Sequence, residues 1–133
     1  MKQYFVVYLA VLGSYLLLDF IWLGLVSQAS YQSAIGHLMR EQIPVWPWVT
    51  FYSVYSAVVV RLVIQPIPPN GKARTAFING VCLGLAAYGA YNMTNYAILE
   101  SWPLSITVKD WAWGTFVTGV ISLCGFGIKR ILK

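Results

Sequence analysis

Residues 4–26 read YFVVYLAVLGSYLLLDFIWLGLV, an unbroken apolar run that contains one charged residue, Asp19. A helix of about 20 residues crosses a hydrocarbon core about 30 Å thick. Because the run is continuous rather than alternating, it predicts a membrane-spanning helix and not a strand of a barrel. The length of the run and the carboxyl inside it argue against a cleaved signal peptide.

Three further apolar stretches have the same character, at residues 45–64, 76–99 and 111–128. Together the four stretches predict an all-α polytopic membrane protein, a four-transmembrane-helix bundle in one domain over residues 1–133. The composition agrees, since 59% of residues are hydrophobic, 10% are charged and the mean hydropathy is +0.66. These values exclude an ordinary soluble enzyme and a disulfide-built secreted module. The basic residues are dispersed, so we expect no nucleic-acid partner.

The loop after the first stretch, residues 28–43, is too polar to span a membrane. Its apolar residues fall on one helical face and its polar residues on the other. The apolar set is Tyr31, Ile35, Leu38 and Met39, and the polar set is Ser33, His37, Arg40 and Glu41. The sequence therefore predicts an interfacial amphipathic helix on the outer surface, ending before Pro44.

Basic residues are distributed unequally between the predicted loops. With the amino terminus inside, the cytoplasmic side holds Lys2, Arg61, Lys72, Arg74, Lys129, Arg130 and Lys133, whereas the other side holds only Arg40 and Lys109. The positive-inside rule then predicts that both termini are cytoplasmic, in a multi-pass protein of a bacterial inner membrane. We interpret the basic carboxy-terminal tail as an electrostatic anchor to anionic lipid.

On this topology every tryptophan and every acidic residue lies towards the outer side. Tryptophan favours the headgroup region, so an aromatic belt is one interpretation. A simple belt, however, would be present at both interfaces. The one-sided placement of tryptophans together with acids also fits an outward-facing polar site.

Asp19 is the most informative single residue. A carboxyl at this depth costs about 3 kcal/mol on insertion scales, so we expect it to face the bundle interior. Tyr15, Asp19 and Trp22 share one helical face. The carboxyl is a candidate general acid or base, a proton carrier or a ligand acceptor. The alternative is a structural tie between helices.

The third stretch offers partners for that carboxyl. Tyr88, Asn92 and Asn95 recur on one face, and Gly80 and Gly84 form a GxxxG pattern on the same side. Small residues at this spacing predict close contact with another helix. The two asparagines fall at a depth similar to that of the intramembrane carboxyl, so we expect them beside it, either as part of a site or as links between helices.

In the fourth stretch, Asp110 stands at the predicted outer end. We interpret it first as an acid near a helix N-terminus, favoured by the helix dipole, and alternatively as a ligand-binding group together with Trp102 and Trp113. We expect no metal and no cofactor. Single His37 cannot form a histidine cluster, and both cysteines fall in the inner half as small apolar residues.

Four segments taken in order resemble the DUF2177 family of small bacterial membrane proteins: LLLDFIWLG at 16–24, IGHLM at 35–39, GLAAYGAYNMTNYAILESWPLS at 84–105 and KDWAWGT at 109–115. The residues that match the family pattern are Asp19, Trp22, Asn95, Trp102, Pro103, Asp110, Trp113 and Gly114. One departure is Asn92, where the family usually carries Asp. The resemblance implies no assigned activity, and it favours a role beside lipid-modification enzymes.

From these observations we expect a protein that binds a lipid or small amphipathic molecule in a polar pocket in the outer half of the bundle. The candidate ligand-binding residues are Asp19, Trp22, Tyr15, Tyr88, Asn92, Asn95, Trp102, Asp110 and Trp113. The partners of the protein would be membrane lipids, with a membrane enzyme or further copies of the chain as additional partners. Three alternatives stay open. They are an intramembrane enzyme that uses Asp19 as acid or base on a lipid-like substrate, a proton-linked transporter acting as an oligomer, and a structural membrane subunit.

Overall fold

The computed structural model describes residues 1–132, and every regular element within this range is helical. Helix α1 (Lys2–Ile21) continues into a π-helical turn, η1 (Trp22–Val26). The short helix α2 (Gln28–Ile35) and a 3-10 turn, η2 (Gly36–Leu38), follow. Helix α3 (Trp46–Val58) continues into a π-helical segment, η3 (Val59–Ile64). Two long helices, α4 (Ala73–Ile98) and α5 (Leu104–Ile131), complete the chain.

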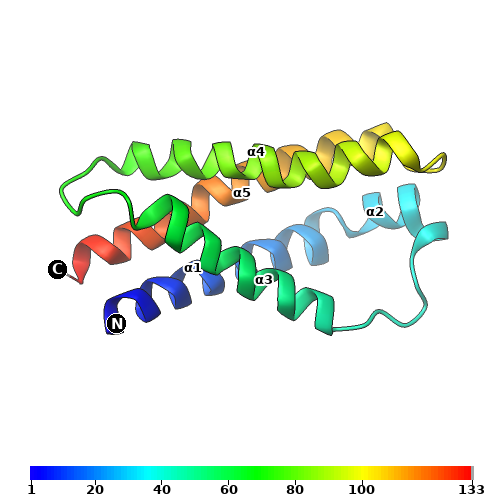
Figure 1. Cartoon of the computed structure of the whole chain (residues 1–133). Helices are drawn as coiled ribbons and strands as arrows, with labels where there is room; N and C mark the ends of the chain where they lie inside the picture. Colours follow the sequence, from blue (N-terminus) through cyan, green and yellow to red (C-terminus); the bar gives the residue numbers. More distant parts are fainter. Residues whose placement is uncertain (133) are drawn as a thin grey trace.

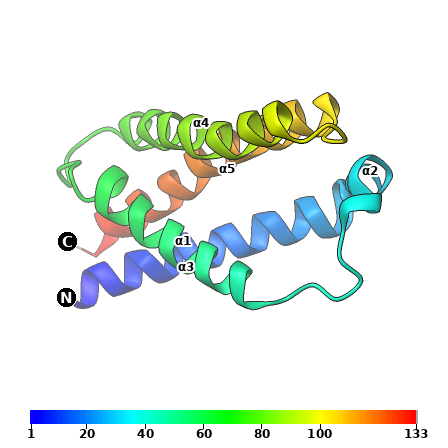
Figure 2. The same cartoon turned by 45° about the vertical axis from the view of Figure 1, so that its right-hand side comes forward.

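The four long helices run between the same two ends of the molecule (Figure 1). Both chain ends and the α3–α4 connection lie at one end, which we call the terminal end. The opposite end, called the distal end, carries α2 and the connections after α2 and α4 (Figure 2). This up-and-down order follows from short connections between successive helices.

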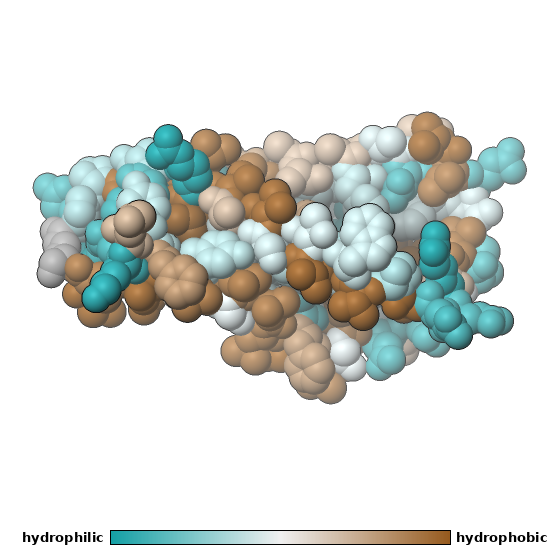
Figure 3. All heavy atoms as spheres, turned by 60° about the horizontal axis from the view of Figure 1, so that its bottom comes forward, coloured by the Kyte–Doolittle hydropathy of each residue, from teal (hydrophilic) through white to brown (hydrophobic). Residues whose placement is uncertain are grey.

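Within residues 1–132, three helical segments are long and apolar enough to cross a membrane: Lys2–Val26, Trp46–Ile64 and Leu104–Ile131. On the face shown in Figure 3, hydrophilic residues gather at both ends and hydrophobic residues lie between them. Helix α4 has 26 residues and lies along α5, but it is too polar to meet the same hydropathy requirement. The all-helical prediction is thus confirmed, with three of the four expected spans identified by length and composition.

The last helix is longer than the span predicted for residues 111–128. Helix α5 begins at Leu104, directly after Pro103 in an extended conformation, and has 28 residues. The sequence prediction stopped at the charged pair Lys109 and Asp110, but a helix about 42 Å long can carry these residues beyond the apolar core. Proline before the first turn suits a helix start because the first N–H groups need no partner there.

The amphipathic helix predicted for residues 28–43 is shorter than expected. Helix α2 ends at Ile35, the 3-10 turn reaches Leu38, and the chain continues without regular structure to the start of α3. Glycine has a low helix propensity, so Gly36 weakens the helix well before Pro44. Tyr31 and Ile35 nevertheless share the face that turns towards the bundle.

The small residues of α4 pack directly on α5, as their spacing predicts. A Cβ atom placed on Gly84 would lie 2.8 Å from the carbonyl oxygen of Gly114 and 2.8 Å from Cα of Thr115. Gly80 is equally crowded by Thr118, where a Cβ would lie 2.6 Å from the carbonyl oxygen. The two backbones therefore approach each other more closely than any residue with a side chain would allow.

An apolar core fills the terminal half of the bundle, where α1, η3, α4 and α5 meet. Its fully buried members are Val7, Val11, Val59, Ile64, Ala76, Val117, Ile121 and Phe126. In the distal half, the packing changes. The backbone of α3 stays close to α1, whereas contacts with α4 and α5 begin only in η3. Helix α3 therefore diverges from α4 towards the distal end (Figure 2).

The interpretation of the basic tail as a lipid anchor predicts that Lys129 extends to lipid headgroups, but it does not. Its side chain is buried, and Nζ donates hydrogen bonds to the carbonyl oxygens of Ile67 at 2.6 Å, Gln65 at 3.0 Å and Ile64 at 3.2 Å. Ile64 is the last residue of η3, and Gln65 and Ile67 follow it. The end of a helix leaves carbonyl groups without an intrahelical partner. The lysine is therefore a cross-helix cap. Arg130 remains exposed, and Lys133 lies outside the described residues.

Candidate functional site

Asp19 faces the interior of the bundle, as its cost in lipid predicts. Its side chain is only 8% exposed. The carboxylate accepts a hydrogen bond from the Tyr52 hydroxyl at 2.5 Å and another from Nε1 of Trp113 at 2.8 Å. These donors come from α3 and α5 rather than from α4. The expectation that Asn92 and Asn95 would be its hydrogen-bonding partners is therefore wrong.

The two asparagines have different surroundings. Asn92 is fully buried, and its Nδ2 donates to the carbonyl oxygen of Tyr88 at 2.9 Å and to Oδ2 of Asp110 at 2.8 Å. Asn95 is half-buried and lies outside the wall of the cavity described below. Asn95 shares the general face of Asn92 but lies about 4.5 Å farther along the helix axis, and the hydrogen bond to a carboxyl is made by Asn92.

Asp110 is not a helix cap, because α5 begins six residues before it. Besides the Asn92 amide, its carboxylate accepts a hydrogen bond from the Tyr31 hydroxyl on α2 at 2.7 Å. Burial raises the pKa of Tyr31, and the negative charge of Asp110 raises it further. The phenol thus stays protonated near neutral pH and holds α2 against α5 as a donor.

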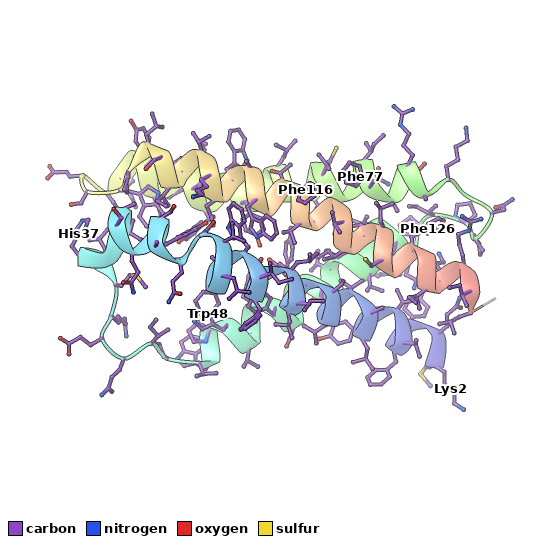
Figure 4. All side chains as sticks on the ribbon, turned by 180° about the vertical axis from the view of Figure 1, so that it is seen from behind. Lys2, His37, Trp48, Phe77, Phe116 and Phe126 are labelled. Carbon is purple, nitrogen blue, oxygen red and sulfur yellow. The ribbon has the colours of Figure 1, made fainter. Side chains whose placement is uncertain are left out.

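The two carboxyls open on one cavity of about 840 Å³. Helix α2 and the chain that follows it cover the cavity at the distal end, and α1, α3, α4 and α5 form its sides. The aromatic side chains in the wall are Tyr31, Trp48, Phe51, Tyr52, Tyr88, Tyr91, Trp102 and Trp113. Trp48 lies near the start of α3 at this end of the bundle (Figure 4). The wall is largely apolar, with a few polar groups fixed in place.

The divergence of α3 from α4 leaves an aromatic rim on the side of the cavity. Trp48 and Phe51 on α3 and Tyr91 on α4 all line the cavity, and their side chains are 46%, 43% and 53% exposed. Phe51 also packs edge to face on Tyr88 of α4, with ring centroids 6.4 Å apart. The opening therefore lies between two helices, below the level of the connections at the distal end.

Buried phenols form the floor beneath the carboxyls. The hydroxyls of Tyr15 and Tyr88 are hydrogen-bonded to each other, and the Tyr55 hydroxyl lies 2.8 Å from Oγ1 of Thr118. The ring of Tyr15 packs edge to face on Tyr52 at a centroid distance of 4.8 Å. Tyr15, predicted as a ligand-binding residue, thus supports the cavity from below and does not line it.

Trp22 also acts behind the wall rather than in it. Its ring stacks on Trp113 with centroids 4.5 Å apart and an angle of 5° between the planes. The ammonium group of Lys109 lies over the Trp22 ring, 5.7 Å from its centroid, and Nζ donates a hydrogen bond to Oγ of Ser30 at 2.8 Å. This stack fixes the indole that donates to Asp19.

Some residues of the site could not be recognised in the sequence. The sequence alone does not single out Tyr52, and it places Tyr31 only on an amphipathic face, yet each donates to a carboxylate. The signal available was their position on aromatic faces next to acids. Of the predicted ligand-binding residues, the cavity wall contains Asp19, Tyr88, Trp102, Asp110 and Trp113.

The whole span that contains these residues matches one family model. The model is described as "Predicted membrane protein (DUF2177)" and covers residues 4–127. The chain belongs to the DUF2177 family. The resemblance of the four sequence segments is thereby confirmed, and the DUF2177 chain is a membrane protein. No curated protein and no solved structure shows significant similarity to it.

Proposed function

We propose that this DUF2177 protein binds a lipid or another small amphipathic molecule in the distal cavity. The observation that carries the proposal is the cavity itself, with two carboxyls set in an aromatic wall. Its volume of about 840 Å³ falls in the range of about 300–1,000 Å³ that is usual for small-molecule sites. The few polar groups would orient a headgroup, and the apolar wall would accept part of a hydrocarbon chain.

The position of the opening supports a ligand that arrives from the membrane. The rim between α3 and α4 consists of exposed aromatic rings. Both flanking helices also carry exposed apolar side chains nearby, including Val49 on α3 and Met93 on α4. Such a surface favours contact with acyl chains over contact with water. A molecule with an apolar part could therefore enter sideways without leaving the bilayer.

The proposal includes four membrane spans, with α4 as the fourth. Its 26 residues give a length of about 39 Å. Its polarity is explained by the faces it buries, because Asn92 contacts Asp110 and the glycines contact α5. We further propose that the termini face the cytoplasm of a bacterial inner membrane, since Lys2, Lys72, Arg74 and Arg130 belong to the terminal end and only Arg40 and Lys109 to the distal end.

Two alanines on α4 allow a matched test. Ala87 lines the cavity, whereas its neighbour Ala86 is exposed and lies outside the cavity wall. Ala87→Trp should fill the cavity, and Ala86→Trp should leave it open. The wild-type protein and both variants would be purified in mild detergent and analysed by native mass spectrometry and lipid extraction.

We expect wild type and Ala86→Trp to retain the same amphipathic molecule and Ala87→Trp to lose it, with unchanged helical circular dichroism. The proposal fails if the wild-type protein carries no molecule, or if the two variants retain it equally.

A further inference from the structure

The charges around the cavity are unbalanced. Each carboxylate receives two hydrogen bonds, and all four donors are neutral groups: Tyr52 and Trp113 for Asp19, and Tyr31 and Asn92 for Asp110. Such bonds orient a carboxylate but do not neutralise it. Without a cation, a carboxyl in an apolar wall either carries an uncompensated charge, which is costly in a medium of low dielectric constant, or takes up a proton, and a bound cation would supply the compensating charge.

The nearest basic residues of the distal end do not fill this role. Lys109 places its ammonium group on Ser30 and over the face of Trp22, and it has no hydrogen bond to either carboxyl. Arg40 belongs to the cavity wall, but its side chain is exposed, and it lies in the connection after η2 that covers the distal end of the cavity. Within the described residues, the cavity wall therefore contains two acids and one basic residue, Arg40 in its cover.

The other wall residues also suit a positive charge. Aromatic faces attract ammonium groups, with about 2 kcal/mol where water is excluded. Tyr52, Trp113 and Tyr88 all line the cavity, and the first two hold Asp19 through their O–H and N–H groups. Neighbouring carboxylates and aromatic faces would act on the same charged group. An anionic headgroup would be repelled by both acids, and a neutral one would leave them uncompensated.

We propose that the molecule bound in this cavity carries an ammonium headgroup, held between Asp19, Asp110 and the aromatic wall. This inference rests on the proposed binding function and specifies its ligand. Arg40 in the cover of the cavity would meet a phosphate, so a zwitterionic phospholipid satisfies both the acids and the arginine of the wall. A primary ammonium would donate to the carboxylates, and a quaternary ammonium would contact mainly the rings.

Short-chain phospholipids with identical tails provide the test. Purified full-length protein would be titrated with dihexanoyl phosphatidylethanolamine, phosphatidylcholine and phosphatidylglycerol, and bound lipid would be counted by native mass spectrometry. We expect at least one of the two ammonium lipids to bind about tenfold more tightly than the glycerol lipid, which corresponds to about 1.4 kcal/mol. A preference for ethanolamine would assign the main role to the carboxylates, and equal binding of the two would assign it to the rings.

Three variants test which carboxyls cause the preference for an ammonium lipid over phosphatidylglycerol. Asp19→Asn and Asp110→Asn should each reduce it to about threefold or less, because each removes one of the two charges. Glu100→Gln removes an exposed carboxyl outside the cavity wall and should leave it intact. Circular dichroism checks that Asp19→Asn keeps its helical content. If Asp19→Asn does not fold, the lipid preference of Asp110→Asn decides the test.

Two outcomes separate this inference from the proposed function. If the three lipids bind wild type equally and Ala87→Trp abolishes all binding, the cavity binds lipid but the ammonium assignment is overturned. If none of the three lipids binds the wild-type protein, both the ammonium assignment and the proposed binding function are refuted. The assignment is also overturned if Asp19→Asn and Asp110→Asn both keep the preference shown by Glu100→Gln.

Discussion

Replacing Gly84 with alanine should force α4 away from α5. The new Cβ would lie 2.8 Å from a carbonyl oxygen and 2.8 Å from a Cα atom, where ordinary contact begins at 3.4 Å. Both are backbone atoms, so no side-chain rotation can relieve the overlap, and the helices must separate by about 0.6 Å locally. Overpacking of this kind costs about 1–3 kcal/mol.

Gly127 on α5 is the matched control, because a Cβ there meets nothing within 4 Å. Gly127→Ala should be neutral or stabilising by up to about 1 kcal/mol, since alanine is the better helix former. Unfolding of both variants would be followed by circular dichroism as the mole fraction of dodecyl sulfate rises in mixed micelles. Gly84→Ala should unfold at a clearly lower fraction than wild type.

The consequence should extend to the cavity. Tyr88 and Asn92 follow Gly84 by one and two helical turns, and Asn92 bonds to Asp110. Separation of the helices at Gly84 would lengthen that bond, so Gly84→Ala should also weaken retention of the bound amphiphile. If Gly84→Ala and Gly127→Ala unfold at the same dodecyl sulfate fraction, the close approach of α4 and α5 is refuted.

Three other predictions follow from contacts at the two ends. Lys129→Met should lower the free energy of unfolding by about 3 kcal/mol, because three carbonyls lose a charged donor. The control Arg130→Met loses an exposed contact over Phe126 and should lower it by less than about 1 kcal/mol. Equal losses for the two variants in the dodecyl sulfate assay would show that the Lys129 cap does not stabilise the fold. Trp113→Phe should weaken binding of the preferred ammonium lipid in the lipid titration described above. Trp111→Phe is the control and should not weaken it, because the Nε1 of Trp111 donates to Leu85 and not to Asp19. An unchanged affinity in Trp113→Phe would contradict the role of the Trp113 indole. In a background without Cys82 and Cys124, Asn70→Cys and Ser101→Cys should react with an impermeant maleimide from opposite sides of the membrane, and labelling of both from one side would exclude α4 as a span.

Much of the helical framework could be predicted because membrane spans leave a strong signal. The long apolar run around Asp19 and the small-residue face of α4 both led to correct statements about which side faces inward. The cost of a carboxyl in lipid and the geometry of glycine contacts are local properties, which one sequence contains.

The partners of each carboxyl could not be predicted, because they depend on how neighbouring helices are rotated and ordered. Asn92 shares the depth expected for a partner of Asp19, but the rotation of α4 directs it to Asp110. Tyr52 comes from α3, which carries no charged residue to mark a site, and yet it supplies the short hydrogen bond to Asp19. The start of α5 was missed because charged residues resemble a loop until packing with α2 is known.

The central claim is that the Asp19 carboxyl opens on a cavity reached from the membrane. A hydrophobic carbodiimide, which dissolves in the apolar phase and couples to carboxyls, tests this claim directly when the modified peptides are mapped by mass spectrometry. We predict an adduct on Asp19 in wild type and in Ala86→Trp, and its suppression in Ala87→Trp, where the cavity is filled. Absence of the adduct in wild type, or equal modification in all three proteins, would contradict the account.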